Sequence, residues 1–222
     1  MSDLFLNQAT FNQDISSWDT SSVTTMEDMF RGASAFNQDL SSWTVSNVLN
    51  MQQTFFKAVA FNNGGSALIN NWNVSSVTNM VGMFSEATSF NRPLESWNVS
   101  SVTRMDRMFK YASAFDKPLN GWNVSSVNNM AGMFFDARVF NQPLNSWNVS
   151  SVTNMSQMFL DARAFNQDLS SWNNRVSSVS TMAQMFQGAR AFNNDGSPLI
   201  NNWDTSSVNT MNGMFNGANN FN

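Results

Sequence analysis

The sequence predicts an α/β fold: a solenoid of about eight coils, each a 25-residue unit of one short strand and one helix, with the strands stacked in a parallel sheet. Three observations support this prediction. Tryptophan recurs at a fixed interval, the other large apolar residues keep a constant distance from it, and extra residues gather at one place in the unit. A unit of this size cannot bury its own aromatic side chains, so equivalent units must stack around a shared core. We expect one continuous domain over residues 1–222.

The tryptophan spacing sets the register of the units. Successive intervals are 25, 29, 25, 25, 25, 25 and 31 residues. The two longer intervals contain Gly-containing insertions after Phe61 and Phe192, and two further residues follow Trp172. Insertions at one position of a repeat are typical of loops on one edge of a solenoid. The coils begin near Trp18, Trp43, Trp72, Trp97, Trp122, Trp147, Trp172 and Trp203, after a partial coil at residues 1–11.

The apolar pattern inside one unit predicts its strand and its helix. Within residues 144–149, apolar and polar residues alternate around Trp147, which is the period of a short strand. Within residues 152–162, apolar residues fall at relative positions 0, 3, 6, 7 and 10, which is one face of a helix. Ser150 or Ser151 stands where a helix N-cap is expected. Each coil is therefore predicted to hold a helix of about ten to twelve residues.

Methionine and asparagine also recur in register. Every Met except Met1 belongs to the repeat, and we interpret these residues as flexible core filler between sheet and helices. A methionine ligand or redox site is the alternative. The Asn after the second Phe of each unit predicts a side-chain ladder that satisfies backbone groups, with a plain surface turn as the alternative. These residues are Asn12, Asn37, Asn62, Asn91, Asn141, Asn166, Asn193 and Asn222, with Asp116 in one coil.

The composition argues against several classes of function. The chain has no Cys and no His, so it lacks the usual zinc ligands and the commonest general base, and we expect no metal, no cofactor and no enzyme activity. Eleven Lys and Arg residues against fifteen Asp and Glu do not suit a nucleic-acid-binding surface. No apolar run is long enough to span a membrane. A faint likeness to a calcium loop at residues 193–196 lacks the spaced acidic ligands.

Charged residues form two groups that keep the register of the repeat. Asp136 and Asp161 recur beside Arg138, Arg163 and Arg190, which indicates a ladder of exposed ion pairs. The second group makes two coils locally basic, and it is either a solvated patch or a contact for an acidic partner. Its members are Arg92, Arg104, Arg107, Lys110 and Lys117. The carboxylate pairs Glu27 with Asp28 and Asp14 with Asp19 are interpreted as solvated surface rather than as catalytic pairs.

The unit Trp-Asn-Val-Ser-Ser-Val-Thr-Asn-Met-x-x-Met-Phe-x-x-Ala-x-x-Phe-Asn-x-x-Leu resembles the BspA-like leucine-rich repeat surface proteins. It is most similar to their 25-residue branch of unknown function, found in Mycoplasma and marine microbes. The resemblance covers the chain from Phe5 to Asn222, with Thr54 for Met and Asp116 for Asn among the departures. It implies a right-handed solenoid like that of leucine-rich repeats. It also implies an extracellular or cell-surface adhesion protein without catalytic residues.

The outward residue after each Trp is the candidate ligand-binding row, because solenoids offer a sheet face as an extended binding surface. The expected function is adhesion to a protein or glycan on another cell or surface. The row has no aromatic or Arg anchors, so it suits a repetitive ligand better than one protein site. Ice binding is a further alternative. The row consists of Asp19, Thr44, Asn73, Asn98, Asn123, Asn148, Asn173 and Asp204.

The alternative function is a structural spacer or a self-associating fibre element. The sequence starts with part of a coil at Phe5 and stops within a unit at Phe221, without a divergent polar cap. Solenoids need capped ends for solubility. The pattern therefore suggests either a fragment of a longer protein or end-to-end stacking through Phe5 and Phe221.

Overall fold

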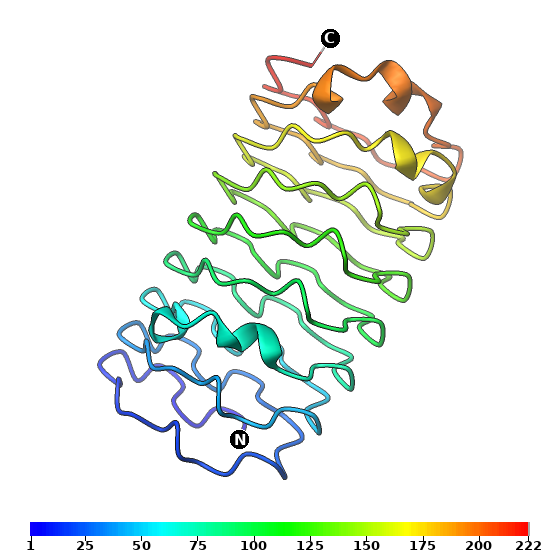
Figure 1. The fold of residues 1–222 in the computed structure, drawn as a ribbon. Helices are drawn as coiled ribbons and strands as arrows, with labels where there is room; N and C mark the ends of the chain where they lie inside the picture. Colours follow the sequence, from blue (N-terminus) through cyan, green and yellow to red (C-terminus); the bar gives the residue numbers. More distant parts are fainter. Residues whose placement is uncertain (222) are drawn as a thin grey trace.

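The computed structural model describes residues 1–221, and Asn222 lies outside the described residues. The chain winds into a stack of similar coils, one for each repeat unit, with the two termini at opposite ends of the stack (Figure 1). Backbone hydrogen bonds join each coil to the next, as from the N–H of Met105 to the carbonyl of Asn129 at 3.1 Å. The tandem repeat is therefore present in the structure as a regular series of coils.

The predicted α/β class is wrong. Residues 1–221 contain no α-helix and no strand of a sheet. Neighbouring coils share only isolated parallel bridges of one residue each, such as that between Asn129 and Asn154. The strand–helix coil of a leucine-rich repeat is therefore absent, and so is the predicted parallel sheet. The helical elements are the short 3₁₀ helices η1 (Asn63–Gly65), η2 (Leu68–Asn71), η3 (Ser170–Arg175), η4 (Asn194–Gly196) and η5 (Pro198–Asn202).

The 3₁₀ helices lie where residues are inserted into the repeat. The loops with η1 and η2 and with η4 and η5 follow the same plan. In each, a fully buried Asn accepts a hydrogen bond from the preceding coil: Asn63 Oδ1 from the N–H of Leu40 at 2.9 Å, and Asn194 Oδ1 from the N–H of Leu169 at 2.8 Å. Each of these two insertions is therefore hydrogen-bonded to the preceding coil.

A series of β-turns replaces the predicted helix. In the coil of Trp18, the N–H groups of Met29 and Ala33 donate to carbonyls three residues earlier, those of Met26 and Phe30. Asp28 and Gly32 are the third residues of these two turns, and their φ angles are 53° and 72°. Positive φ is incompatible with an α-helix and is required at the third position of a type II turn. The equivalent segments of the other coils also hold residues with positive φ, including Arg107 and Tyr111.

The turns leave alternate N–H groups free to bond to the next coil. The N–H groups of Asp28 and Phe30 donate to the carbonyls of Gln52 and Thr54 at 3.0 and 2.8 Å. The backbone of this segment is therefore satisfied between coils rather than along a helix. The inward spacing of 0, 3, 6, 7 and 10 seen in residues 152–162 arises because successive turns point Met, Phe and Ala side chains to the same side.

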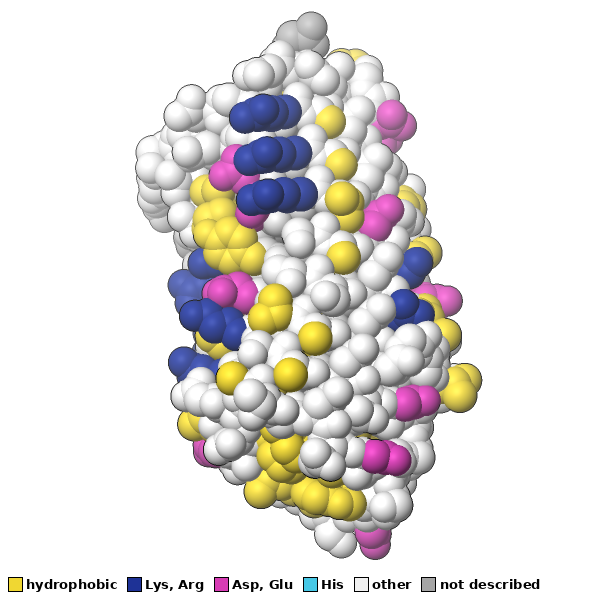
Figure 2. Space-filling model, turned by 90° about the vertical axis from the view of Figure 1, so that its left-hand side faces the viewer, with side chains coloured by type: hydrophobic (Ala, Val, Ile, Leu, Met, Phe, Trp, Pro, Cys, Tyr) yellow, Lys and Arg dark blue, Asp and Glu magenta, His cyan; other side chains and the backbone are white. Residues whose placement is uncertain are grey.

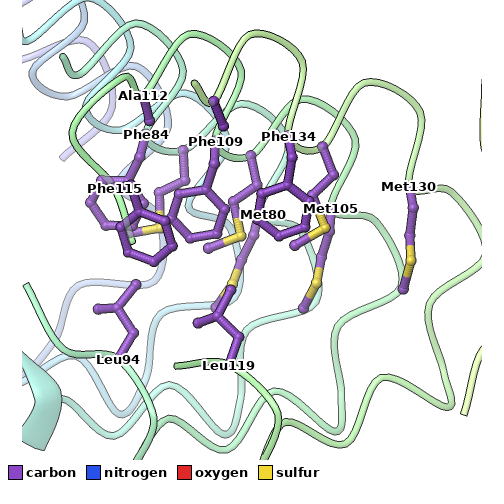
Figure 3. Packing of buried hydrophobic residues seen from close by; sticks show 14 of the residues in the cluster. Met80, Phe84, Leu94, Met105, Phe109, Ala112, Phe115, Leu119, Met130 and Phe134 are labelled. Carbon is purple, nitrogen blue, oxygen red and sulfur yellow. The ribbon is translucent and has the colours of Figure 1, made fainter. Parts of the chain in front are cut away.

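The core consists of side-chain columns that run through the stack. In one column, Phe rings of successive coils stack with centroids 5.3 to 5.8 Å apart, and in a second they stack at 5.7 to 6.1 Å. The two Phe rings of one coil are 3.8 to 4.1 Å apart. Met side chains form a parallel row beside them (Figure 3). Thr54, which replaces a Met, is buried and donates its hydroxyl to the carbonyls of Met26 and Met51.

Two polar ladders accompany the apolar columns. Each Trp after the first donates its indole N–H to a carbonyl of the preceding coil, as Trp122 does to Leu94 at 2.9 Å. The expected asparagine ladder also forms: Oδ1 of Asn37 accepts from the N–H of Asn62 at 2.8 Å, and the same bond recurs along the stack. Asp116 takes the Asn position without loss, because only an acceptor oxygen is needed.

Replacement of a central tryptophan should destabilise the stack. Trp122→Ala removes a side chain that is 3% exposed and leaves the carbonyl of Leu94 without its donor. We expect a loss of about 3 to 5 kcal/mol of unfolding free energy from the cavity. Chemical denaturation followed by far-UV circular dichroism measures it, with the exposed Asn123→Ala as control. An unchanged midpoint for Trp122→Ala would contradict the stacked core.

The asparagine ladder makes a second prediction. Asn37→Leu removes the oxygen that accepts from the N–H groups of Asn62 and Gly64, at 2.8 and 3.0 Å. We expect a loss of about 1 to 3 kcal/mol, since both donors are left without this partner. Asn37→Asp retains the acceptor and should stay within about 0.5 kcal/mol of the parent at neutral pH. Equal destabilisation by both substitutions in denaturant titrations would rule out the acceptor role.

Candidate binding surface

The row of residues after the tryptophans does not lie on a sheet face, because no sheet exists in the described part of the chain. Seven of the eight residues are exposed and directly precede a turn, and Asn173 is half-buried. In most of them the side-chain oxygen accepts from the N–H two residues later, as Asp19 does from Ser21 at 2.9 Å and Asn98 from Ser100 at 3.2 Å. Hydrogen bonds from Ser21 lower the pKa of Asp19. These side chains stabilise their own turns, and a ligand contact at them stays a prediction.

Two members of the row depart from this pattern. Thr44 is exposed. Its backbone carbonyl, and not its side chain, accepts a hydrogen bond from the hydroxyl of Thr20. Oδ1 of Asn173 is buried without a hydrogen-bond partner. The two residues inserted after Trp172 move the Val-Ser-Ser turn to residues 176–178 and place Asn173 in η3, so the residue two positions after Asn173 is Arg175 and not the usual serine. The row is therefore not uniform in its local bonding.

Phe5 and Phe221 lie near opposite ends of the stack and belong to different Phe columns, because Phe5 stacks on Phe30 and Phe221 on Phe192. Each is partly buried and continues a Phe column. Phe5 stacks on Phe11 at 3.8 Å, and Phe221 stacks on Phe215 at 4.0 Å. Their predicted part in self-association stays a prediction.

Charged and aromatic side chains gather instead on one long side of the stack, which we call the turn face. It is formed by the outward residues of 25–35 and of the equivalent segments of the other coils. Figure 2 shows basic side chains stacked in a column on this side, next to apolar ones. Eight of the eleven basic residues belong to it, namely Arg31, Lys57, Arg104, Arg107, Lys110, Arg138, Arg163 and Arg190.

An aromatic–basic patch stands out on the turn face; it consists of Phe56, Lys57, Arg107, Lys110, Tyr111 and Phe135. The ammonium of Lys110 lies 4.7 Å from the ring centre of Phe135 and 5.1 Å from that of Tyr111, and these two rings are 5.0 Å apart. Lys57 lies over Phe56 at 5.2 Å. Burial of the Lys110 ammonium lowers its pKa, and the charge of Arg107 adds to this effect, while Glu86 opposes it.

An open hollow of about 540 Å³ adjoins the patch. Its walls come from successive coils and combine apolar surface with hydroxyls and one ion pair. Lys57 Nζ and Glu86 Oε2 are 3.9 Å apart there, which is a loose pair. The volume lies within the range of ligand sites. The lining residues are Gly32, Ser34, Lys57, Val59, Glu86, Thr88 and Tyr111.

The expected ladder of ion pairs forms in only one place. Arg138 binds Asp136 through two nitrogens, with the closest atoms 2.9 Å apart, and hydrogen bonding to Asp136 raises the pKa of Arg138. Within the described residues, no ion pair involves Asp161, Arg163 or Arg190. Two exposed guanidinium groups therefore remain available on the turn face.

The second basic group is divided by the structure. Arg107 and Lys110 belong to the patch, and Arg104 pairs with Asp106 beside it at 3.1 Å. Arg92 has a structural role, since it donates to the carbonyl of Gly65 at 2.7 Å in the first insertion loop. The sequence contained the signal for the turn face, namely the columns of charge. The aromatic members were missed because the residue type at their positions changes from coil to coil, unlike that of the core positions.

No group of three or more Asp and Glu side chains within residues 1–221 is placed to hold a metal ion. None of the helices found in this range has the length and apolarity needed to cross a membrane.

Comparison with known proteins gives one match. The family model described as "Mycoplasma protein of unknown function, DUF285" matches residues 1–68, 65–138, 94–197 and 122–222, which together span the chain. No curated protein and no solved structure matches the sequence.

The electrostatics of the patch predict opposite effects for two substitutions. Arg107→Gln should raise the pKa of Lys110, because removal of a neighbouring positive charge favours the protonated amine. Glu86→Gln should lower it further, because a favourable negative charge is lost. Titration of the Lys110 Cε resonance by NMR measures both shifts. Shifts of the same sign, or none, would contradict the arrangement of the patch.

Proposed function

We propose that this chain, which belongs to the DUF285 family of Mycoplasma proteins of unknown function, is a non-catalytic binding module of the adhesion type. In this proposal, it recognises a protein or glycan of another surface through the turn face. The resemblance of its repeat to BspA-like surface proteins supports this assignment and an extracellular or cell-surface location. That resemblance is an analogy, whereas the side chains of the turn face are a property of this chain itself.

The observation that carries the proposal is where the repeat is broken. Core positions hold nearly the same residues in every coil, whereas outward positions of the turn face change from coil to coil: the position of Phe56 holds Ser85, Lys110 and Phe135 in the coils that follow. Phe56, Tyr111 and Phe135 stay only half-buried although large aromatic side chains gain most from burial. Aromatic rings and Arg beside each other are the composition of interface hot spots. The patch therefore has the chemistry of a binding surface.

The scaffold suits this role because it holds the anchors in fixed positions. Backbone hydrogen bonds between coils bracket the patch, as from the N–H of Tyr111 to the carbonyl of Phe135 at 2.7 Å. Phe55 and Phe134, which precede Phe56 and Phe135 in the sequence, belong to a buried Phe column. An anchor that is already ordered loses little conformational freedom on binding, which favours affinity.

The alternative proposal, a structural spacer or self-associating element, places the contacts at Phe5 and Phe221. Sedimentation velocity over a range of concentrations separates it from the first proposal. Assembly that is abolished by Phe5→Lys with Phe221→Glu supports the alternative. A monomer at all concentrations contradicts self-association.

The binding proposal is tested with an array of purified extracellular-matrix proteins and defined glycans. The patch variant carries Phe56→Ser, Lys110→Gln and Phe135→Ser. Its matched control carries Asn98→Ala, Asn123→Ala and Asn148→Ala in the row after the tryptophans. We expect at least one saturable ligand whose affinity falls tenfold or more in the patch variant, about 1.4 kcal/mol or more, and less in the control.

Thermal melting establishes that both variants are folded before binding is compared. Loss of binding in the control but not in the patch variant would move the site to the row after the tryptophans. Retention of full affinity in the patch variant would overturn the proposal.

A further inference from the structure

We propose that the hollow and the column of Arg138, Arg163 and Arg190 form one axial groove that binds a linear acidic oligosaccharide. This inference rests on the proposed binding function and names its ligand class. The hollow would take sugar rings, and the arginine column would take carboxylate or sulfate groups further along the same chain.

The hollow and the arginine column are aligned along the stack. Ser34 and Val59 of the hollow occupy the same position of the repeat as Arg138 and Arg163. The same backbone bond occurs at this position in both parts: the carbonyl of Ser34 accepts from the N–H of Ala60 at 3.1 Å, and that of Arg138 from Ala164 at 3.2 Å. The residues therefore lie in one line along the stack, one coil after another.

The lining of the hollow suits a sugar ring. A pyranose presents a hydroxyl-rich edge and a more apolar face of C–H groups. The ring of Tyr111 and the side chain of Val59 offer apolar contacts for that face. Glu86 and Lys57 provide an acceptor and a donor, and their separation of 3.9 Å leaves both free to bond to a ligand. Small hydroxyl residues complete the wall.

The charge of the arginine column suits acidic groups. A guanidinium binds carboxylate or sulfate through two parallel hydrogen bonds. Arg138 is already paired with Asp136, but Arg163 and Arg190 are exposed and make no ion pair among the described residues. Oδ1 of Asp161 occupies the space that a Cβ at Gly188 would fill, so this carboxylate lies against the next coil and not against Arg163. Like charges on adjacent coils repel each other, and an acidic ligand would remove that repulsion.

The spacing of the arginine column matches the length of a sugar unit. Chains joined by backbone bonds of this kind lie about 4.8 Å apart. A pyranose unit is roughly 5 Å long, close to this step, whereas same-face side chains of an extended peptide recur at about 6.6 Å. The groove therefore favours a glycan over an acidic peptide.

The test measures binding of four probes to the whole chain by isothermal titration calorimetry. Hexagalacturonate carries carboxylates, and a heparin-derived hexasaccharide carries sulfates as well. Cellohexaose is the neutral glycan and hexaglutamate the acidic peptide. We expect at least one acidic hexasaccharide to bind tenfold or more tightly than both comparison probes, and the stronger of the two identifies the acidic group.

Variants assign the binding to the groove. Arg163→Gln with Arg190→Gln should weaken the acidic hexasaccharide at least tenfold and reduce the salt dependence of its binding. Tyr111→Ser should weaken it at the other end of the groove. The matched control, Arg104→Gln with Lys117→Gln, removes the same charge outside the groove and should change affinity less than twofold. Equal loss in this control, or equal binding of hexaglutamate, overturns the glycan groove.

The groove and the proposed function fail in different ways. If the parent chain binds no hexasaccharide, but the patch variant loses affinity for an array ligand, the groove alone is overturned. A chain that binds acidic hexasaccharides through Arg163 and Arg190, with the patch variant unchanged on the array, retains the groove and overturns the role of the patch.

Discussion

Hydrogen bonding from the backbone of one coil to the next is the interaction on which the rest of the structure depends. A segment of consecutive β-turns satisfies only part of its own backbone, so an isolated unit would leave polar groups without partners. Alternate N–H groups, such as those of Asp28 and Phe30, reach carbonyls of the following coil. This requirement fixes the register between coils. Once the register is fixed, each side chain lies above its equivalent, and columns of Phe, Met, Trp and Asn follow.

The columns explain which departures from the repeat are tolerated. Thr54 replaces a buried Met because its hydroxyl finds two carbonyl acceptors, so no polar atom is left unsatisfied. Asp116 replaces an Asn because the ladder uses a side-chain oxygen and needs no donor. Asn173 is the exception, and its buried Oδ1 lacks a partner where two extra residues change the turn. Outward residues of the turn face meet no such condition, and they are free to vary from coil to coil.

Much of the architecture could be predicted from the sequence, but its local structure could not. The tryptophan intervals gave the number and register of coils, and the position of Asn37 and its equivalents indicated the ladder. The helix was predicted because spacing at 0, 3, 6, 7 and 10 fits a helix face. A ribbon of turns gives the same spacing, and the positive φ that distinguishes it falls on residues such as Arg107 and Tyr111, which carry no glycine signal. The turn face was visible as charge columns. Lys110 and Phe135 stand 25 residues apart at the same repeat position, but the contact between their side chains depends on rotamers that the sequence does not specify.

Because equivalent positions are aligned along the stack, the number of repeat units sets the number of identical contacts that the protein can offer to a ligand. Duplication of a unit adds a coil and, with it, another copy of whatever side chain that unit presents, as with the guanidinium groups at Arg138, Arg163 and Arg190. Each copy arrives in line with the others and needs no new fold. A polymer that spans several copies gains avidity from each added contact without any single contact becoming stronger. The number of repeat units in such a protein would then set the avidity of its attachment.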